Sequence, residues 1–243
     1  MITHLVVRQC NDCGAALDHN LGYRGRHITT DWTGESVMIT LYGKVMSRAA
    51  RCVWVLEELG VDYEHVPTDS RTGKDKTAEF LAINPSGKIP ALKDGDVSLF
   101  ESLGINLYLA QKYGVGTLWP EDAYGQARAV QWTLFAATEI EPPGAARLVE
   151  FIFKSEDERN QDILDAAAER AGPVIDVIEA SLQKSRYLAG DTFTIADLNA
   201  SATLEYLDRT GVDLRPWSKA YAWFSTCISR PANQRVTEMK KTS

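Results

Sequence analysis

Cysteine is scarce in this sequence and long apolar runs are absent, and both absences narrow what the protein can be. The 243 residues include only four cysteines, unevenly spaced, so no disulfide framework is predicted. No apolar run reaches the roughly 18 residues that a membrane-spanning helix needs. A signal peptide is not predicted either, because Arg8 and the polar segment 10–13 follow the short apolar start. A reducing cytoplasm is therefore the expected location.

Positive charge is also in deficit. Lysine and arginine number 26 against 33 aspartates and glutamates, which gives a formal net charge of -7. Nucleic-acid backbones and anionic membrane surfaces would not attract such a chain, so neither is expected as its main partner. The apolar fraction of 44% is ordinary for a globular protein, and the length is enough for one large domain or two small ones.

Residues 1–37 lack the periodic apolar pattern of the rest of the chain. We predict that they form an N-terminal extension that is flexible, or an artefact of an upstream start, because the triplet Met-Ile-Thr occurs at both Met1 and Met38. Cysteine and histidine are zinc ligands, and the pair Cys10-x-x-Cys13 has three histidines near it in the sequence. Their spacing fits no zinc-finger pattern, so no metal is expected.

Strand and helix patterns alternate in residues 38–115, which we predict to form one domain. Expected strands are 39–42, 63–66, 89–92 and 97–100, and expected helices are 47–59, 74–82 and 102–112. The order β-α-β-α-β-β-α is that of a thioredoxin-like α/β domain whose later strands are antiparallel.

No good strand candidate occurs after the Gly- and Pro-containing segment 116–126, which we interpret as a linker. Residues 127–243 are therefore predicted to form an all-α helical bundle domain. Its expected helices cover about 126–140, 145–153, 160–182, 194–207 and 217–229, with a break at 141–143, an interruption at 172–173 and a basic tail. Within it, Thr194 and Asp197 form a capping-box pattern, for which we expect a structural role.

The stretch from Asn84 to Ser102, NPSGKIPALKDGDVSLFES, carries most of the site prediction. A proline at the first position of a strand, here Pro90, suits a place where main chain faces a ligand. Glu101 and Ser102 begin a helix, where free N–H groups favour an anion, although a plain helix cap would explain Ser102 equally well.

Together with the segment 38–60, this stretch resembles the glutathione-binding half of a soluble glutathione transferase of the serine-type, bacterial-like kind. The resemblance covers most of the chain. It implies that Ile89, before a cis Pro90, offers its main chain to the cysteinyl part of glutathione. It further implies that Glu101 and Ser102 bind the γ-glutamyl end and that Lys88 faces the glycine carboxylate, although an exposed loop lysine would also explain Lys88.

The resemblance also assigns thiolate stabilisation to Ser47, with Arg48 as an alternative source of positive charge. Ionising a thiol of pKa ~8.5 at neutral pH requires about 3 kcal/mol, which a hydrogen bond and a helix N-terminus can supply. From the residues alone, a plain N-cap would explain Ser47 as well. A thioredoxin-like redox mechanism is not expected, because Cys52 lies on an apolar helix face and Cys10/Cys13 precede the first strand.

Substrate selection is assigned by the resemblance to the helical half, where we name Trp132, Phe135 and Glu139, with Ala136 and Tyr206 as further candidates. The predicted activity is transfer of glutathione, as cosubstrate, to an apolar electrophile by a homodimer. Two alternatives stay open: another glutathione-dependent activity on the same fold, such as β-ether cleavage, dehalogenation, peroxide reduction or isomerisation, and a non-catalytic binding or regulatory protein.

Overall fold

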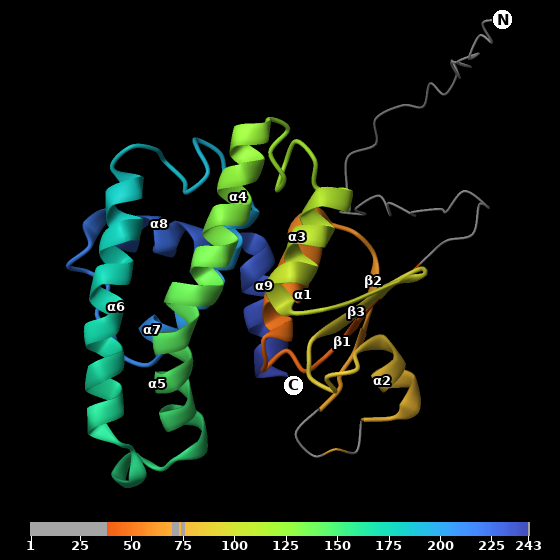
Figure 1. Cartoon of the computed structure of the whole chain (residues 1–243), viewed down its shortest axis with the longest axis horizontal. Helices are drawn as coiled ribbons and strands as arrows, with labels where there is room; N and C mark the ends of the chain where they lie inside the picture. Colours follow the sequence, from red (N-terminus) through yellow and green to blue (C-terminus); the bar gives the residue numbers. More distant parts are fainter. Residues whose placement is uncertain (1–37, 70–72, 74–75, 243) are drawn as a thin grey trace, which may run out of the picture.

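The computed structural model describes residues 38–69, 73 and 76–242. The predicted extension 1–37, with its Cys10/Cys13 pair, lies outside these residues. An α/β half and a helical half stand side by side, with the helices α1, α3 and α9 between the sheet and the helices α4 to α8 (Figure 1).

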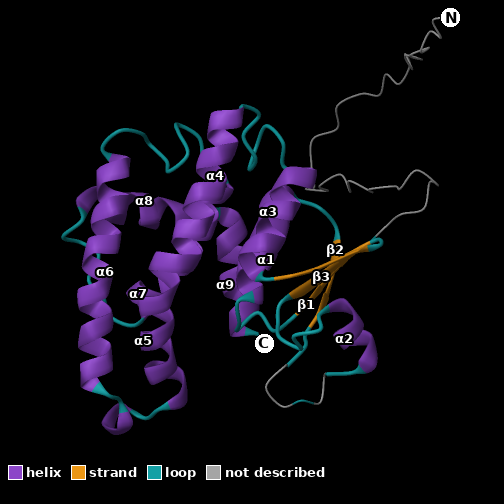
Figure 2. Ribbon diagram, viewed as in Figure 1, coloured by secondary structure: helices purple, strands orange, loops and turns teal. Residues whose placement is uncertain are grey.

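The α/β half has a four-stranded mixed sheet. Its elements are β1 (Ile39–Tyr42), α1 (Ala49–Leu59), β2 (Tyr63–Val66), α2 (Ala78–Ile83), β3 (Ala91–Asp94), β4 (Val97–Phe100) and α3 (Ser102–Tyr113). The strand order is β2-β1-β3-β4, with β1 parallel to β2 and antiparallel to β3, and β3 antiparallel to β4. Helices α1 and α3 lie on the side of the sheet that faces the helical half, and α2 lies on the other (Figure 2). The predicted fold class is confirmed.

The helical half continues from residue 123. Its elements are α4 (Ala123–Phe135), a π-helical segment η1 (Ala136–Ile140), α5 (Glu141–Phe153), a 3-10 turn η2 (Glu156–Glu158), α6 (Gln161–Leu182), α7 (Ile195–Arg209), α8 (Ser218–Ile228) and α9 (Pro231–Lys241). Within the described residues beyond 126, no strand forms.

The predicted breaks at proline residues are wrong. Helix α4 runs through η1 into α5 without interruption, and the predicted break at 141–143 falls in the first turn of α5. Proline is tolerated in a first helical turn, and a π-helical segment shifts the register at the junction. Helix α6 likewise continues through Pro173.

The predicted basic tail is also wrong, because residues 231–241 form helix α9. The guanidinium of Arg230 pairs with Glu58 at 2.6 Å, and Arg235 pairs with Glu57; both carboxylates belong to α1. The sequence of α9 is polar and gives no sign of a stable helix. Packing on α1 therefore supplies its stability.

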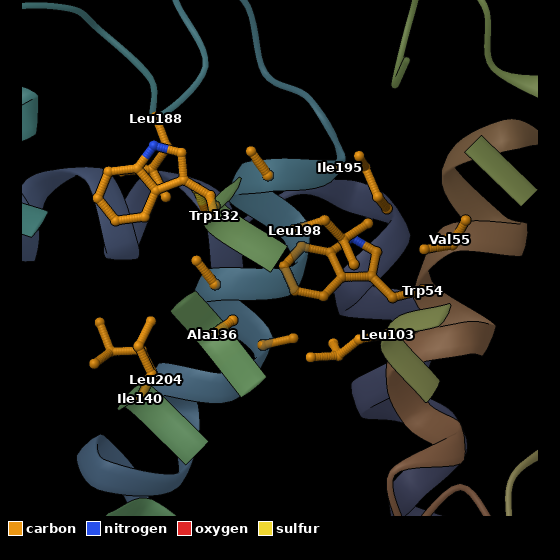
Figure 3. Close-up of a cluster of buried hydrophobic side chains, with 14 of the residues drawn as sticks. Trp54, Val55, Leu103, Trp132, Ala136, Ile140, Leu188, Ile195, Leu198 and Leu204 are labelled. Carbon is orange, nitrogen blue, oxygen red and sulfur yellow. The ribbon is translucent and has the colours of Figure 1, made fainter. Parts of the chain in front are cut away.

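The core extends through both halves. Trp54 and Val55 from α1, Leu103 from α3 and Leu198 from α7 lie close to one another in the cluster of Figure 3. Asn106 donates a hydrogen bond to Asn199 at 2.8 Å across the same boundary. The described part of the chain contains no helix long and apolar enough to cross a membrane.

The capping box predicted at the start of α7 is present. The buried Asp197 carboxylate accepts hydrogen bonds from the Thr194 and Leu188 main-chain N–H groups and from Trp223 Nε1. Burial raises the pKa of this carboxyl, and the surrounding donors oppose that rise. Asp197 therefore joins α7, α8 and the loop before them, as expected of a structural residue.

Candidate functional site

A cavity of about 590 Å³ lies between the two halves. The α/β half contributes residues 44–48 of the loop between β1 and α1, three residues of α1, Asp69, Lys88 and Ile89. The helical half contributes residues from α5, α7 and α9. This volume is typical of a pocket for a small molecule.

Ser47 lies in the cavity wall, immediately before α1. Its hydroxyl donates a hydrogen bond to the Lys44 carbonyl at 2.7 Å and accepts one from the Ala49 N–H at 3.1 Å. Ser47 therefore bonds to the main chain on both sides of it, one residue before the N-cap Arg48, and its role toward a ligand stays a prediction. The hydroxyl has to turn away from Lys44 before it can donate to a ligand, because a hydroxyl has a single hydrogen.

Ile89 and Lys88, which the resemblance assigns to glutathione binding, border the same cavity. The bond between Ile89 and Pro90 is cis. Neither the N–H nor the C=O of Ile89 is hydrogen-bonded to any residue that the structure describes. A peptide ligand can pair with such main-chain groups as an added strand does.

Gly43 allows this segment to approach the loop before α1. Its φ is 142°, and a Cβ atom there would come within 2.8 Å of the Ala49 Cβ and 3.3 Å of the Ile89 Cβ. A larger residue would therefore push the start of α1 away from Ile89. Ser47 and Ile89 lie in one cavity wall partly because glycine separates β1 from α1.

Glu101 and Ser102 are at the start of α3, outside the cavity wall itself. Glu101 has a φ of 69°, a conformation that costs a non-glycine residue about 1–3 kcal/mol. Its side chain is exposed, whereas Ser102 is buried and its carbonyl accepts a hydrogen bond from the Cys52 thiol. The strained main chain presents the Glu101 side chain to solvent beside the free N–H groups of α3.

Arg48 does not point freely into the cavity. It is bound to Glu141, the first residue of α5, and the other oxygen of that carboxylate accepts a hydrogen bond from Arg51 at 2.8 Å. Burial acts to raise the pKa of Glu141, but the charges of Arg51 and Arg48 outweigh it and hold that pKa below its usual value.

Arg51 is a site residue that sequence reasoning missed. Its side chain is 3% exposed, it borders the cavity, and its guanidinium lies 4.8 Å from the centroid of the Tyr206 ring. Two of its nitrogens, Nε and Nη2, have no hydrogen-bond partner within the described part of the chain. The two positive charges of Arg48 and Arg51 exceed the one negative charge of Glu141, so a net positive charge lies about one turn after Ser47. Its position four residues after Ser47 was the available signal.

The apolar part of the wall comes from α5 rather than from α4. Val149, Ile152 and Phe153 border the cavity and are about half exposed, as is Met46 before α1. Tyr206, a further candidate, is placed there by α7.

The structure brings none of the three main pocket candidates to this cavity. Trp132 is buried in the core beside Ala136 and Leu188 (Figure 3). Phe135 and Glu139 border a separate hollow along α4. An apolar helix face gives the same periodic signal whether it meets the core or a ligand, which is why the sequence pointed to 132–139, whereas α5 borders this cavity.

The described cysteines are buried and free. Burial raises the pKa of the Cys52 thiol well above its usual value, so it stays protonated and apolar, as predicted for a core residue. Among the described residues, no three His, Cys, Asp or Glu side chains gather as metal ligands do.

Comparison with known proteins identifies the family. The model of the glutathione S-transferase N-terminal domain matches residues 37–111, and that of the C-terminal domain matches residues 141–231. The chain belongs to the glutathione S-transferase family. Glutathione S-transferase 3 of Zea mays is 39% identical over 208 residues, which cover 82% of this chain and 92% of the relative. The glutathione S-transferase of Hyoscyamus muticus is 34% identical over 212 residues, 83% of this chain and 98% of the relative.

Solved structures agree with these relatives. Glutathione S-transferase I from maize, in complex with an atrazine glutathione conjugate, superimposes with a TM-score of 0.77 at 35% identity, covering 85% of this glutathione S-transferase and 99% of the maize chain. The predicted family and transferase activity are confirmed. The expectation of a bacterial-like member finds no support in these relatives, which are plant proteins.

Proposed function

We propose that this glutathione S-transferase is of the serine type: it binds glutathione along Ile89, ionises the thiol beside Ser47 and transfers the thiolate to an apolar electrophile held by α5 and α7. The observation that carries the proposal is the shared cavity wall, in which the Ser47 hydroxyl and the unpaired main chain of Ile89 lie next to the start of α1. The tripeptide lies extended against Ile89, with Lys88 near its glycine carboxylate and Glu101 and Ser102 near its γ-glutamyl end.

Ionisation of the thiol depends on three positive influences in this arrangement. The N-terminus of α1 supplies the positive end of the helix dipole, the turned Ser47 hydroxyl supplies one hydrogen bond, and the pair Arg48 and Arg51 exceeds the single charge of Glu141. Arg48 acts through this cluster rather than by direct contact with the sulfur, because Glu141 holds its guanidinium.

Replacing Ser47 by alanine tests the proposal. A hydrogen bond to a charged group contributes about 1.5–3 kcal/mol, so S47A should lower kcat about 10–100-fold and raise the pKa of bound glutathione by about 1–2 units. Thiolate absorbance against pH measures the pKa, an aryl halide assay measures kcat, and calorimetry should show glutathione binding retained. Ser218, exposed at the start of α8, gives the control S218A. Unchanged turnover in S47A would remove Ser47 from this role.

We further propose a homodimer formed through α4 and β4. Tyr124, Val130 and Leu134 on α4 are exposed apolar side chains, and β4 adds Val97 and Phe100. Exposed apolar residues on a helix and on an edge strand are typical of subunit interfaces. A cytoplasmic location accords with the free thiols of Cys52 and Cys227.

A further inference from the structure

The part of the cavity wall formed by α7 and α9 carries charge that the proposed function leaves unused. Arg209 ends α7 and Lys240 lies in the last turn of α9, and both border the cavity with Tyr206. Tyr206 and Arg209 are three residues apart on α7, so they are neighbours on one helix face. Lys240 lies 3.6 Å from Glu205, which places the end of α9 beside this face.

Arg209 is the uncompensated cation of this region. It is exposed, and it makes no hydrogen bond or ion pair with any residue the structure describes. Lys240 is partly neutralised by Glu205, and Lys44, at the other side of the cavity, is paired with Asp69 at 2.6 Å. Of the described side chains that border the cavity, six are cationic and two are carboxylates: Lys44, Arg48, Arg51, Lys88, Arg209 and Lys240 against Asp69 and Glu205.

The same cavity is lined by apolar side chains and by these cations. Val149, Ile152 and Phe153 offer an apolar surface for the reacting part of a substrate, and Arg209 offers a planar donor that suits a carboxylate. We propose that the acceptor substrate is an apolar electrophile that carries a carboxylate, with Arg209 as its main partner and Lys240 as a second. This inference rests on the proposed function and specifies its substrate class.

The reaction balances without any further reactant. The glutathione thiol releases its proton to water, and the thiolate sulfur attacks the ring carbon that bears chlorine. The S–C bond forms first and gives an anionic adduct whose charge the nitro groups of the ring take up; the C–Cl bond then breaks, and chloride leaves with the bonding electron pair. The carboxylate takes no part in this exchange, so its effect is one of binding and orientation.

A matched pair of substrates tests the inference. The ring of 4-chloro-3,5-dinitrobenzoate is the same as that of 4-chloro-3,5-dinitrobenzamide, but only the first carries a charge. After correction for the uncatalysed rate with glutathione, we expect kcat/KM to favour the benzoate about tenfold, since a charge-assisted hydrogen bond is worth at least that factor. The variant R209M keeps the apolar stem and should bring the ratio to about one, and K240M should lower it less.

The control variant is R170M, which removes an exposed arginine of α6 outside the cavity and should keep the wild-type ratio. Arg209 also lies at a helix C-terminus, where a cation stabilises the helix, so the melting temperature of each variant is followed alongside. Equal kcat/KM values for benzoate and benzamide in the wild-type enzyme, or an R209M ratio equal to that of wild type, would overturn the inference.

Calorimetry with the two product conjugates of glutathione gives a readout that does not need turnover. The carboxylated conjugate should bind about tenfold more tightly than the amide, and R209M should abolish the difference. If the enzyme bound both conjugates but transferred glutathione to neither substrate, the proposed function would fail, and the ratio of dissociation constants would still decide the inference.

Discussion

At the scale of one residue, Asp197 is an ionisable side chain with a structural role and not a chemical one. Its side chain lies in the interior and gathers donors from three places in the chain. The sequence revealed this role because a capping box is a local pattern, in which a residue and its partner are three positions apart.

The variant D197A should be destabilised by at least about 3 kcal/mol, because it leaves the buried N–H groups of Leu188, Thr194 and Trp223 without an acceptor. The melting temperature should fall by roughly 6–12 °C. D197N keeps one acceptor oxygen and should lose less. Calorimetric melting with a turnover assay checks this: lost turnover at an unchanged melting temperature would contradict a structural role.

Ser47 and Ile89 could be proposed as site residues because each lies in a short segment that resembles the family, whereas Arg51 and Arg209 could not. A single arginine in a helix has no local signature of function. The role of such an arginine depends on residues that are distant in the sequence. Arg51 pairs with Glu141, and Arg209 shares a cavity with residues of α5.

At the scale of elements, strands were predicted better than helix ends. Strands 39–42, 63–66 and 97–100 coincide with β1, β2 and β4, since short apolar runs bounded by turn residues define strands locally. Helix boundaries at prolines were misjudged, because local patterns do not show whether a proline falls in a first turn. Helix α9 was missed because its partners Glu57 and Glu58 are far away in the sequence.

The junction of α1 with α5 leads to a pH-dependent prediction. E141Q removes the charge shared by Arg48 and Arg51, and since Arg51 is buried, the variant should lose about 3 kcal/mol at pH 7. The lowered folded pKa of Glu141 means that its contribution is complete above the unfolded pKa of ~4.3 and disappears as pH falls through the folded value.

Denaturant unfolding of wild type and E141Q between pH 7 and pH 3 measures this difference, which should shrink toward zero at the acid end. Glu169, exposed on α6, provides the control E169Q, for which little change is expected at any pH. A difference between wild type and E141Q that stayed constant across the range would show that charge is not its cause.

At the scale of the whole molecule, the exposed apolar face of α4 predicts association. The wild-type protein should have twice the 26.9 kDa mass of one chain in light scattering, and L134E should be shifted to the monomer because a charge would be buried against the partner. V177E introduces the same charge on α6, where Val177 is 48% exposed, and should stay dimeric. A monomeric wild-type protein would exclude the proposed interface.

Helix α9 has a consequence for how the protein is made. The arginines that bind Glu57 and Glu58 follow them by 178 and 172 positions, and a ribosome adds residues in that order. While the polypeptide is growing, Glu57 and Glu58 of α1 therefore lack their arginine partners and have only the nearby donors Tyr63 and Trp54. Contacts of such long range slow folding, so the nascent glutathione half gains its final support only when synthesis has passed Arg235.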